Sequence, residues 1–168
     1  MSISRVPEPS EDGRKCPFLR RVNEPGQIFE AVALASMIFW IVTHFDLKKS
    51  RTFPCLAARG SIGEILDNTE CERCKLEYPV RKRGYLHVWS VKDRREEFLE
   101  ITPTTWCFAK MAWPMLSTLR GWRITAVRGK GRTARLSLTL QEPWHAQDLS
   151  KLPEEKTPEE CLENTMRI

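Results

Sequence analysis

Residues 85–91, Tyr85-Leu86-His87-Val88-Trp89-Ser90-Val91, alternate between two kinds of side chain, which is typical of a β-strand. Side chains two positions apart share a face of a strand, so the three rings lie on one side and the aliphatic side chains on the other. A charged turn over residues 92–96 follows, and the stretch Glu97-Phe98-Leu99-Glu100-Ile101-Thr102 returns as a second strand. The predicted hairpin indicates a mainly β protein.

Four more elements are predicted around this hairpin. Thr102-Pro103-Thr104 is typical of a helix start, and Pro114 shortens the last turn of that helix. Glycines at 129 and 131 favour a tight reversal between the last two strands. An alanine-rich start at residue 28 favours a helical turn before the first strand. The predicted elements are a strand over 37–45, a helix over 105–116, and strands over 121–127 and 135–141.

The resulting order is strand, long connection, strand, strand, helix, strand, strand. Over residues 37–141 this order resembles the OB-fold, a five-stranded barrel with one helix between strands 3 and 4. The resemblance implies that a nucleic acid would cross strands 2 and 3, between loops one-two and four-five. The competing interpretation is an unrelated ββαββ domain beside a separate zinc ribbon.

The connection over residues 46–80 holds a cysteine pair with the spacing of a metal site. Cys71 and Cys74 stand in Glu70-Cys71-Glu72-Arg73-Cys74-Lys75, where one tight turn directs two thiolates at a single ion. Upstream of this pair, Cys55 follows a proline. His44 lies further upstream, at the end of the apolar stretch that precedes the connection. One histidine and three cysteines suit tetrahedral Zn²⁺, and a full set of protein ligands makes the site structural. We therefore predict a structural zinc ion held by His44, Cys55, Cys71 and Cys74, which orders this long connection.

Other interpretations of the cysteines remain open. A redox dithiol normally opens a helix in a βαβ unit, and Leu76-Glu77-Tyr78-Pro79 opens none. A disulfide framework fits poorly, because the 6 cysteines are spread over 168 residues and no secretory signal precedes them. Ordinary reduced cysteines are the third interpretation. The fourth ligand is the weakest assignment, and the other candidates for it are Cys16, Cys107, Cys161, His87 and His145.

Charge is distributed unevenly along the chain. It holds 27 Lys and Arg against 22 Asp and Glu, but residues 142–168 alone carry seven acidic and three basic residues. The body is therefore strongly basic and the tail acidic, a pattern of polyanion binders whose tail competes for the binding groove. We expect a flexible leader over residues 1–27, an OB-like domain over 28–141 with the zinc insertion at 46–80, and a flexible acidic tail over 142–168.

A single strand of nucleic acid is bound by rings that stack on bases and cations that meet phosphates. The three rings of residues 85–91 are flanked by basic residues, and a second run of cations follows residue 120 with no acid between them. We expect an exposed aromatic platform bordered by these cations. The predicted nucleic-acid-binding residues are Tyr85, His87, Trp89, Arg81, Lys82, Arg83, Arg123, Arg128, Lys130, Arg132 and Arg135.

Motifs of catalysis are not found in the sequence. It has no Gly-x-Ser-x-Gly, no Gly-x4-Gly-Lys-Ser/Thr and no His-Glu-x2-His. The acids at 93, 96, 97 and 100 are close in sequence, but turn and edge-strand acids usually face solvent. The apolar stretch before His44 is too short to span a membrane. We therefore expect a non-enzymatic, cytoplasmic protein that binds single-stranded DNA more than RNA; the alternative is a non-catalytic adaptor or small subunit of a larger nucleoprotein complex.

Overall fold

The computed structural model describes residues 17–55, 58–59, 64–65, 71–131, 134–141 and 150–156. These residues form ten strands and two helices. In chain order they are β1 (Phe18–Arg20), β2 (Ile28–Ala33), β3 (Phe39–Asp46), β4 (Arg51–Pro54), β5 (Ala58–Arg59), β6 (Glu64–Ile65), α1 (Glu72–Lys75), β7 (Val80–Ser90), β8 (Arg95–Ile101), α2 (Pro103–Met111), β9 (Arg123–Arg128) and β10 (Leu136–Gln141).

Eight of these strands belong to one mixed sheet. Its main path runs β1-β8-β7-β2-β9-β10, and β3 pairs with both β7 and β4 beside that path. The pairing of β1 with β8 is parallel and the other pairings are antiparallel. Among the described residues no pairing joins β8 to β10, so this sheet is not closed. The prediction of a mainly β protein is confirmed, whereas a five-stranded barrel is not.

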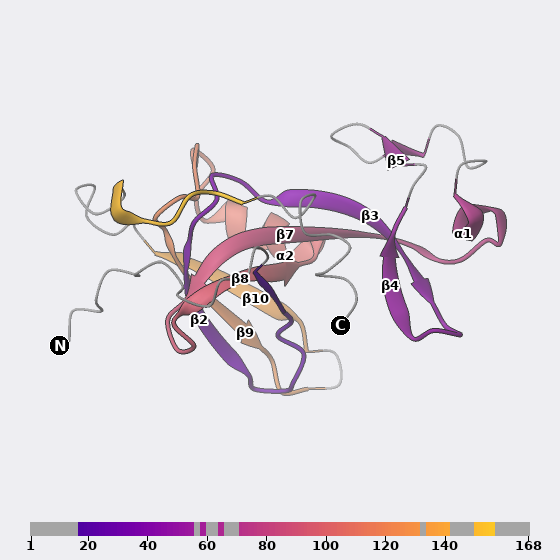
Figure 1. Ribbon diagram of the computed structural model, residues 1–168. Helices are drawn as coiled ribbons and strands as arrows, with labels where there is room; N and C mark the ends of the chain where they lie inside the picture. Colours follow the sequence, from indigo (N-terminus) through magenta and orange to yellow (C-terminus); the bar gives the residue numbers. More distant parts are fainter. Residues whose placement is uncertain are drawn as a thin grey trace.

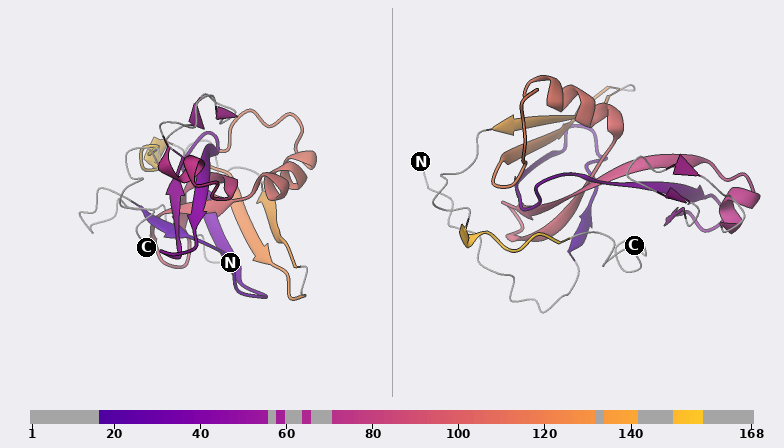
Figure 2. Two further views of the ribbon diagram at one scale, coloured as in Figure 1. Left: turned by 90° about the vertical axis from the view of Figure 1, so that its right-hand side faces the viewer. Right: turned by 90° about the horizontal axis from the view of Figure 1, so that it is seen from above.

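Strand β7 joins the main body of the sheet to a projecting arm. The arm consists of residues 39–55 and 71–83, which hold β3, β4, α1 and the first part of β7. The first half of β7, from Val80 to Tyr85, pairs with β3, while its second half pairs with β8 and, at its end, with β2. Figure 1 shows β3 and β7 leaving the body side by side, with β4 and α1 at the far end, and the view from above in Figure 2 shows the same projection. At Gly84 a Cβ atom would lie 2.6 Å from Ile38 and 2.8 Å from Trp40. Glycine therefore allows the close packing at the junction of arm and body.

The main core lies between β7 and α2. Leu86 and Val88 of β7 pack there with Ala109 of α2 and with alternate residues of β10. The helix begins at Pro103, two residues before the predicted start, and Thr102 caps it: the Thr102 hydroxyl oxygen accepts a hydrogen bond from the Thr105 N–H (3.2 Å). It ends at Met111, short of residue 116, because Pro114 disfavours the helical conformation of the residue that precedes it.

The second face of β7 is also buried, and the prediction of an exposed aromatic platform is wrong. Tyr85, His87 and Trp89 are only 2%, 1% and 7% exposed. Tyr85 packs with Phe98 of β8, and Trp89 packs with Leu152 of the segment 150–156. Rings of this size bury enough apolar area to act as core residues, and here they do.

The predicted ends of the domain need correction. Part of the leader is structured: β1 lies in parallel beside β8, where Arg20 makes two hydrogen bonds to the buried Glu97 carboxylate (2.6 and 2.8 Å). Part of the acidic tail, residues 150–156, lies against the body. Residues 1–16, 142–149 and 157–168 lie outside the described residues.

Two boundaries within the domain also differ from prediction. The alanine-rich stretch forms β2 and no helical turn, because it pairs with β7 and β9. Strand β7 begins at Val80, five residues before the predicted start, because β3 supplies its partner there. No helix in the described part of the chain combines the length and the apolar character that crossing a membrane requires.

His87 makes the stability of the body depend on pH. Its Nδ1 accepts a hydrogen bond from the Lys156 backbone N–H (3.1 Å), and Glu96 lies 3.6 Å from its Nε2. Burial, followed by the nearby charges of Lys156 and Arg120, lowers the pKa of His87 to about 3. In an unfolded chain the pKa is about 6.5. The resulting stabilisation is complete above about pH 6.5 and is lost as the pH falls toward 3.

We predict that His87→Asn removes this pH dependence. The asparagine side-chain oxygen can accept the same N–H and does not titrate. Between pH 7 and pH 5 the wild type should lose about 2 kcal/mol more unfolding free energy than the variant, measured by urea denaturation. The other titrating groups are common to both proteins, so they cancel in the difference. Parallel pH profiles would contradict the prediction.

Candidate metal centre

The arm brings the first two metal ligands together through a tight hairpin. The Asp46 carboxylate accepts hydrogen bonds from the N–H groups of Lys48 and Lys49 (3.0 and 3.1 Å), which closes the turn between β3 and β4. The register pairs His44 of β3 with Phe53 of β4. The Cys55 N–H then donates to the Val42 carbonyl (2.8 Å), so Cys55 stays beside β3.

The other two ligands lie at the ends of the single turn of α1. Cys71 is the N-cap residue and Cys74 lies within the helix, so the C-x2-C spacing places both thiols at one end of the arm. Residues 76–79, Leu76-Glu77-Tyr78-Pro79, form no helix; the single helical turn lies within the cysteine pair. The N–H groups of Glu77 and Tyr78 close the turn on the carbonyls of Cys74 and Arg73 (3.1 and 3.0 Å). This is a Schellman end, with Glu77 at a φ of 54° where glycine is usual.

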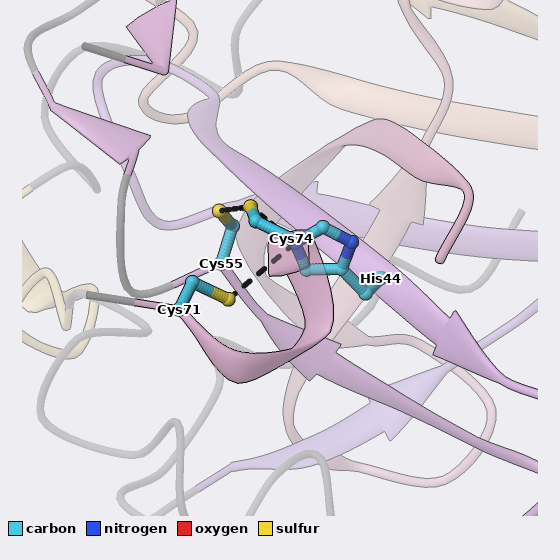
Figure 3. Close-up of side chains that lie close together, drawn as sticks. All are labelled: His44, Cys55, Cys71 and Cys74. Carbon is cyan, nitrogen blue, oxygen red and sulfur yellow. Dashed lines mark hydrogen bonds between the residues drawn. The ribbon is translucent and has the colours of Figure 1, made fainter. Parts of the chain in front are cut away.

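Four donor atoms converge between these elements, as predicted. Figure 3 shows His44, Cys55, Cys71 and Cys74 pointing toward one another. Their donor atoms all lie within 4.8 Å of one another. The Cys74 sulfur lies 3.5 Å from the Cys55 sulfur and 3.3 Å from His44 Nε2, which is also 3.6 Å from the Cys71 sulfur. Tetrahedral Zn²⁺ with ordinary bond lengths separates its ligand atoms by roughly 3.6–3.8 Å.

The tautomer of His44 suits a metal ligand. Its Nδ1 lies 3.1 Å from the Tyr78 carbonyl oxygen, which can only accept a hydrogen bond, so Nδ1 carries the proton. The lone pair of Nε2 therefore faces the three sulfurs. A ligand histidine usually has such a second hydrogen bond, which fixes its ring orientation. The Schellman end of α1 thus determines the ring orientation, because it positions the Tyr78 carbonyl.

The electrostatics of the thiols also favour a cation. Burial, followed by the neighbouring Cys55 and Cys71 thiols, raises the pKa of Cys74 to about 12. Three thiolates so close together repel one another unless a positive charge lies between them. A dication supplies that charge, because metal binding displaces the thiol protons. The side chains therefore fit a metal of the zinc class, and the four ligands would leave no open position for catalysis.

The predicted nucleic-acid-binding residues fall in separate parts of the molecule. Tyr85, His87 and Trp89 are in the core of the body, as described above. The three cations from 81 to 83 lie on the arm, where they follow the exposed end of β7. Arg123 and Arg128 belong to β9 in the body (Figure 1), and Lys130 and Arg135 lie between β9 and β10.

The members of the β9–β10 group have different surroundings. Arg128 is half-buried and donates to the Val22 carbonyl (2.8 Å), a contact within the fold. Arg123 and Lys130 are exposed. Arg135 is exposed at a cavity of about 600 Å³ beside the start of α2. Arg132 lies outside the described residues.

Sequence reasoning missed the aromatic residues of the arm. The Arg73 guanidinium lies 3.6 Å from the centre of the Phe53 ring, and Lys49 lies over the same ring at 5.7 Å. Arg81 and Lys82 lie 5.8 and 5.7 Å from the centres of the Phe45 and Trp40 rings. Phe53 and Arg73 could have been suspected from their places beside Cys55 and between Cys71 and Cys74. The other pairings require the cross-strand register.

The four acids of the β7–β8 hairpin are occupied by cations, and the expectation that they face solvent is wrong for Glu97. That residue is fully buried and accepts hydrogen bonds from Arg20 and Arg95. Asp93 pairs with Arg20 and Glu96 with Lys156. Glu100 pairs with Arg21 and Arg83.

Comparison of this chain with protein-family models, with curated proteins and with solved structures returns no match. The interpretation of the metal centre and the arm therefore rests on the residues themselves.

We predict that the purified wild type contains one Zn²⁺ per chain and that Cys71→Ser loses it. Structural zinc contributes on the order of 10 kcal/mol to small sites, so the variant should melt at a much lower temperature. Elemental analysis and thermal denaturation measure the two effects. Cys107→Ser is the matched control, since Cys107 is exposed on α2. Zinc-free wild type with an unchanged melting curve in strong chelator would refute the prediction.

Proposed function

We propose that this protein binds single-stranded nucleic acid, DNA in preference to RNA, and that structural Zn²⁺ fastens the arm that makes the contact. The observation that carries the proposal is the set of cation–ring pairs on the arm. Binding of a single strand needs flat surfaces for bases and positive charge for phosphates. Each of these pairs supplies both, because the cation lies next to the ring. The metal has an architectural role, because it joins β3, β4 and α1.

The charge of the arm supports this proposal. Residues 39–55 and 71–83 contain eight Lys and Arg and three acids. One of those acids, Asp46, accepts the hydrogen bonds of its own turn and lies 3.8 Å from Arg73. The arm therefore carries a net positive charge on a narrow projection. Cations of this kind release counterions from a phosphate backbone when they bind, which drives association at low salt.

The geometry of Arg73 and Phe53 suits a base. At 3.6 Å from the ring centre, the guanidinium is in contact with the ring. A stacked guanidinium has a second face, and bases stack on such planes as they do on aromatic rings. Phe45, Phe53 and Trp40 are each partly exposed, unlike the rings of the body. The stacking surface proposed from the sequence is therefore relocated from the body to the arm.

The proposed fold is a partly open OB-type barrel. Its strands would be β2 with β3, then β7, β8, β9 and β10, with α2 between the third and the fourth. Four supporting pairings are β2–β7, β7–β8, β2–β9 and β9–β10. OB-folds are often open at one seam. In this interpretation the metal-bound arm is an extension of loop one-two.

The alternative function is an adaptor within a nucleoprotein complex. One observation favours it: Phe108 and Met111 of α2 and the following Met115 are 59%, 70% and 91% exposed. Large apolar side chains gathered at one place on a surface often mark a protein contact. In an adaptor the arm would contact RNA or protein only inside the assembly. A chain that binds no isolated strand at any salt concentration would favour this function.

We predict that Arg81→Ala/Lys82→Ala weakens binding to all single-stranded sequences about equally. Each phosphate contact contributes roughly 0.7 to the slope of log affinity against log salt, so the slope should become shallower by about 1.4. Fluorescence anisotropy with labelled DNA and RNA oligonucleotides over a salt series measures it. Lys92→Ala/Lys110→Ala removes two exposed charges from the body and should change the slope little. Equal slopes in the two variants would contradict the assignment to the arm.

A further inference from the structure

Residues 150–156 cover the ring-bearing face of β7. Leu152 is 6% exposed and packs with Val32, Leu34 and Trp89 in a cluster separate from the main core. Figure 2, seen from above, shows this segment in yellow on the opposite side of β7 from α2. Residues 150–156 thus lie on part of the surface that the sequence predicted for a nucleic acid.

The covering segment has one apolar anchor, and its other contacts are polar. Arg120 donates hydrogen bonds to the Leu152 and Pro153 carbonyls (3.2 and 3.1 Å). The Glu155 carboxylate accepts from the N–H and the hydroxyl of Ser36 (3.2 and 3.3 Å). The Lys156 ammonium pairs with Glu96 (2.5 Å), in addition to the hydrogen bond from its backbone to His87. Segments held mainly by partly exposed polar contacts open more easily than packed strands.

Each group beneath the segment has a second possible partner in a single strand. The Arg120 guanidinium can bind a phosphate, and the Trp89 indole can stack on a base. His87 Nδ1 can accept an N–H from a base edge. The segment therefore occupies a set of groups that nucleic acid also recognises. Glu96 opposes a phosphate once Lys156 leaves, but the uncovered His87 can protonate and pair with it.

The covered face continues directly into the arm. Residues 81, 83, 85, 87 and 89 of β7 share one side of the strand. The first two are Arg81, which is exposed, and Arg83, which is partly exposed. The last three are the buried rings: Tyr85 packs with Phe98, and His87 and Trp89 contact residues 150–156. A nucleic-acid strand that follows this face from the arm would meet the edge of residues 150–156. The path is open over the arm and closed over the body.

We propose that residues 150–156 are an intramolecular competitor on the second half of the strand-binding surface. This inference rests on the proposed function, and its ligand is the same single-stranded nucleic acid. Release of the segment exposes Trp89, His87 and Arg120, and the bound strand extends from the arm onto the body. Residues 150–156 hold two Lys and two Glu, so the segment competes by occupying these groups and not through a net charge.

The test uses the full chain in three forms: the wild type, Leu152→Ala/Glu155→Ala and Glu154→Ala. The double variant loses the apolar anchor and the contact to Ser36, whereas Glu154 is exposed and its replacement changes the net charge equally. The apparent affinity of an occluded site is its intrinsic affinity multiplied by the fraction of molecules in which the site is open. We expect the double variant to bind a single-stranded oligonucleotide about tenfold more tightly at low salt, and Glu154→Ala to bind nearly as the wild type does.

Photo-crosslinking identifies where the strand lies. An oligonucleotide containing 5-iodouracil should crosslink to the peptide that contains Trp89 in the double variant. The wild type offers a check that requires no substitution: amide hydrogen exchange in residues 150–156 should become faster when the oligonucleotide saturates the protein. Unchanged exchange in the wild type, with crosslinks confined to the arm, overturns this inference and leaves the proposed function intact. Absence of binding by all three proteins overturns both.

Discussion

In its second half, strand β7 is paired along both edges and packed on both faces, and the rest of the molecule is arranged around that constraint. From Gly84 to Ser90 it pairs with β8, and on its other edge the His87 carbonyl accepts hydrogen bonds from Leu34 and Ala35 between the stretches paired with β3 and β2. A strand so enclosed leaves no solvent for its polar side chains, and a buried polar group without a partner is costly. The Tyr85 hydroxyl therefore donates to Glu100 (3.2 Å), and His87 depends on the Lys156 backbone. Residues 150–156 therefore hold their position partly because β7 needs a hydrogen-bond partner for His87.

The arm faces the opposite difficulty, because it has too little core. Its apolar core is a small cluster of Val42, Cys55 and Cys71, with Cys74 packed against it. A projection of that size cannot bury enough apolar surface to order itself, and small units with this deficit commonly use a metal. Three of the four ligands come from the segments that would otherwise be held least. An ion held by these four ligands would also fix Phe53 beneath Arg73, since both residues lie close to ligands in the sequence.

The sequence predicted those parts of the structure that depend on short-range pattern. Period-two alternation located the β7–β8 hairpin and β10. The cysteine spacing, with His44 as the weakest assignment, predicted the four residues of the candidate metal cluster. It failed where a distant segment decides the environment. The same alternation that marks Tyr85, His87 and Trp89 as one face cannot say what covers that face. Their burial depends on β8, on β1 and on residues more than sixty positions away. The partly exposed rings of β3 acquire their cations only through the register of β3 with β7.

The two faces of β7 are built from different chemistry. Toward α2 the strand presents Leu86 and Val88, and their neighbours are aliphatic, as in an ordinary permanent core. On its other face it presents Tyr85 against Phe98, and His87 and Trp89 against residues 150–156. One ring atom, His87 Nε2, has no hydrogen-bond partner among the described residues. A core that never opens gains nothing from such groups, since aliphatic side chains of similar volume avoid the cost of desolvating them. Side chains of this kind are instead typical of surfaces that exchange one polar partner for another. The contrast within a single strand is therefore the strongest structural reason to propose that the second face is a covered binding surface, continuous with the arm.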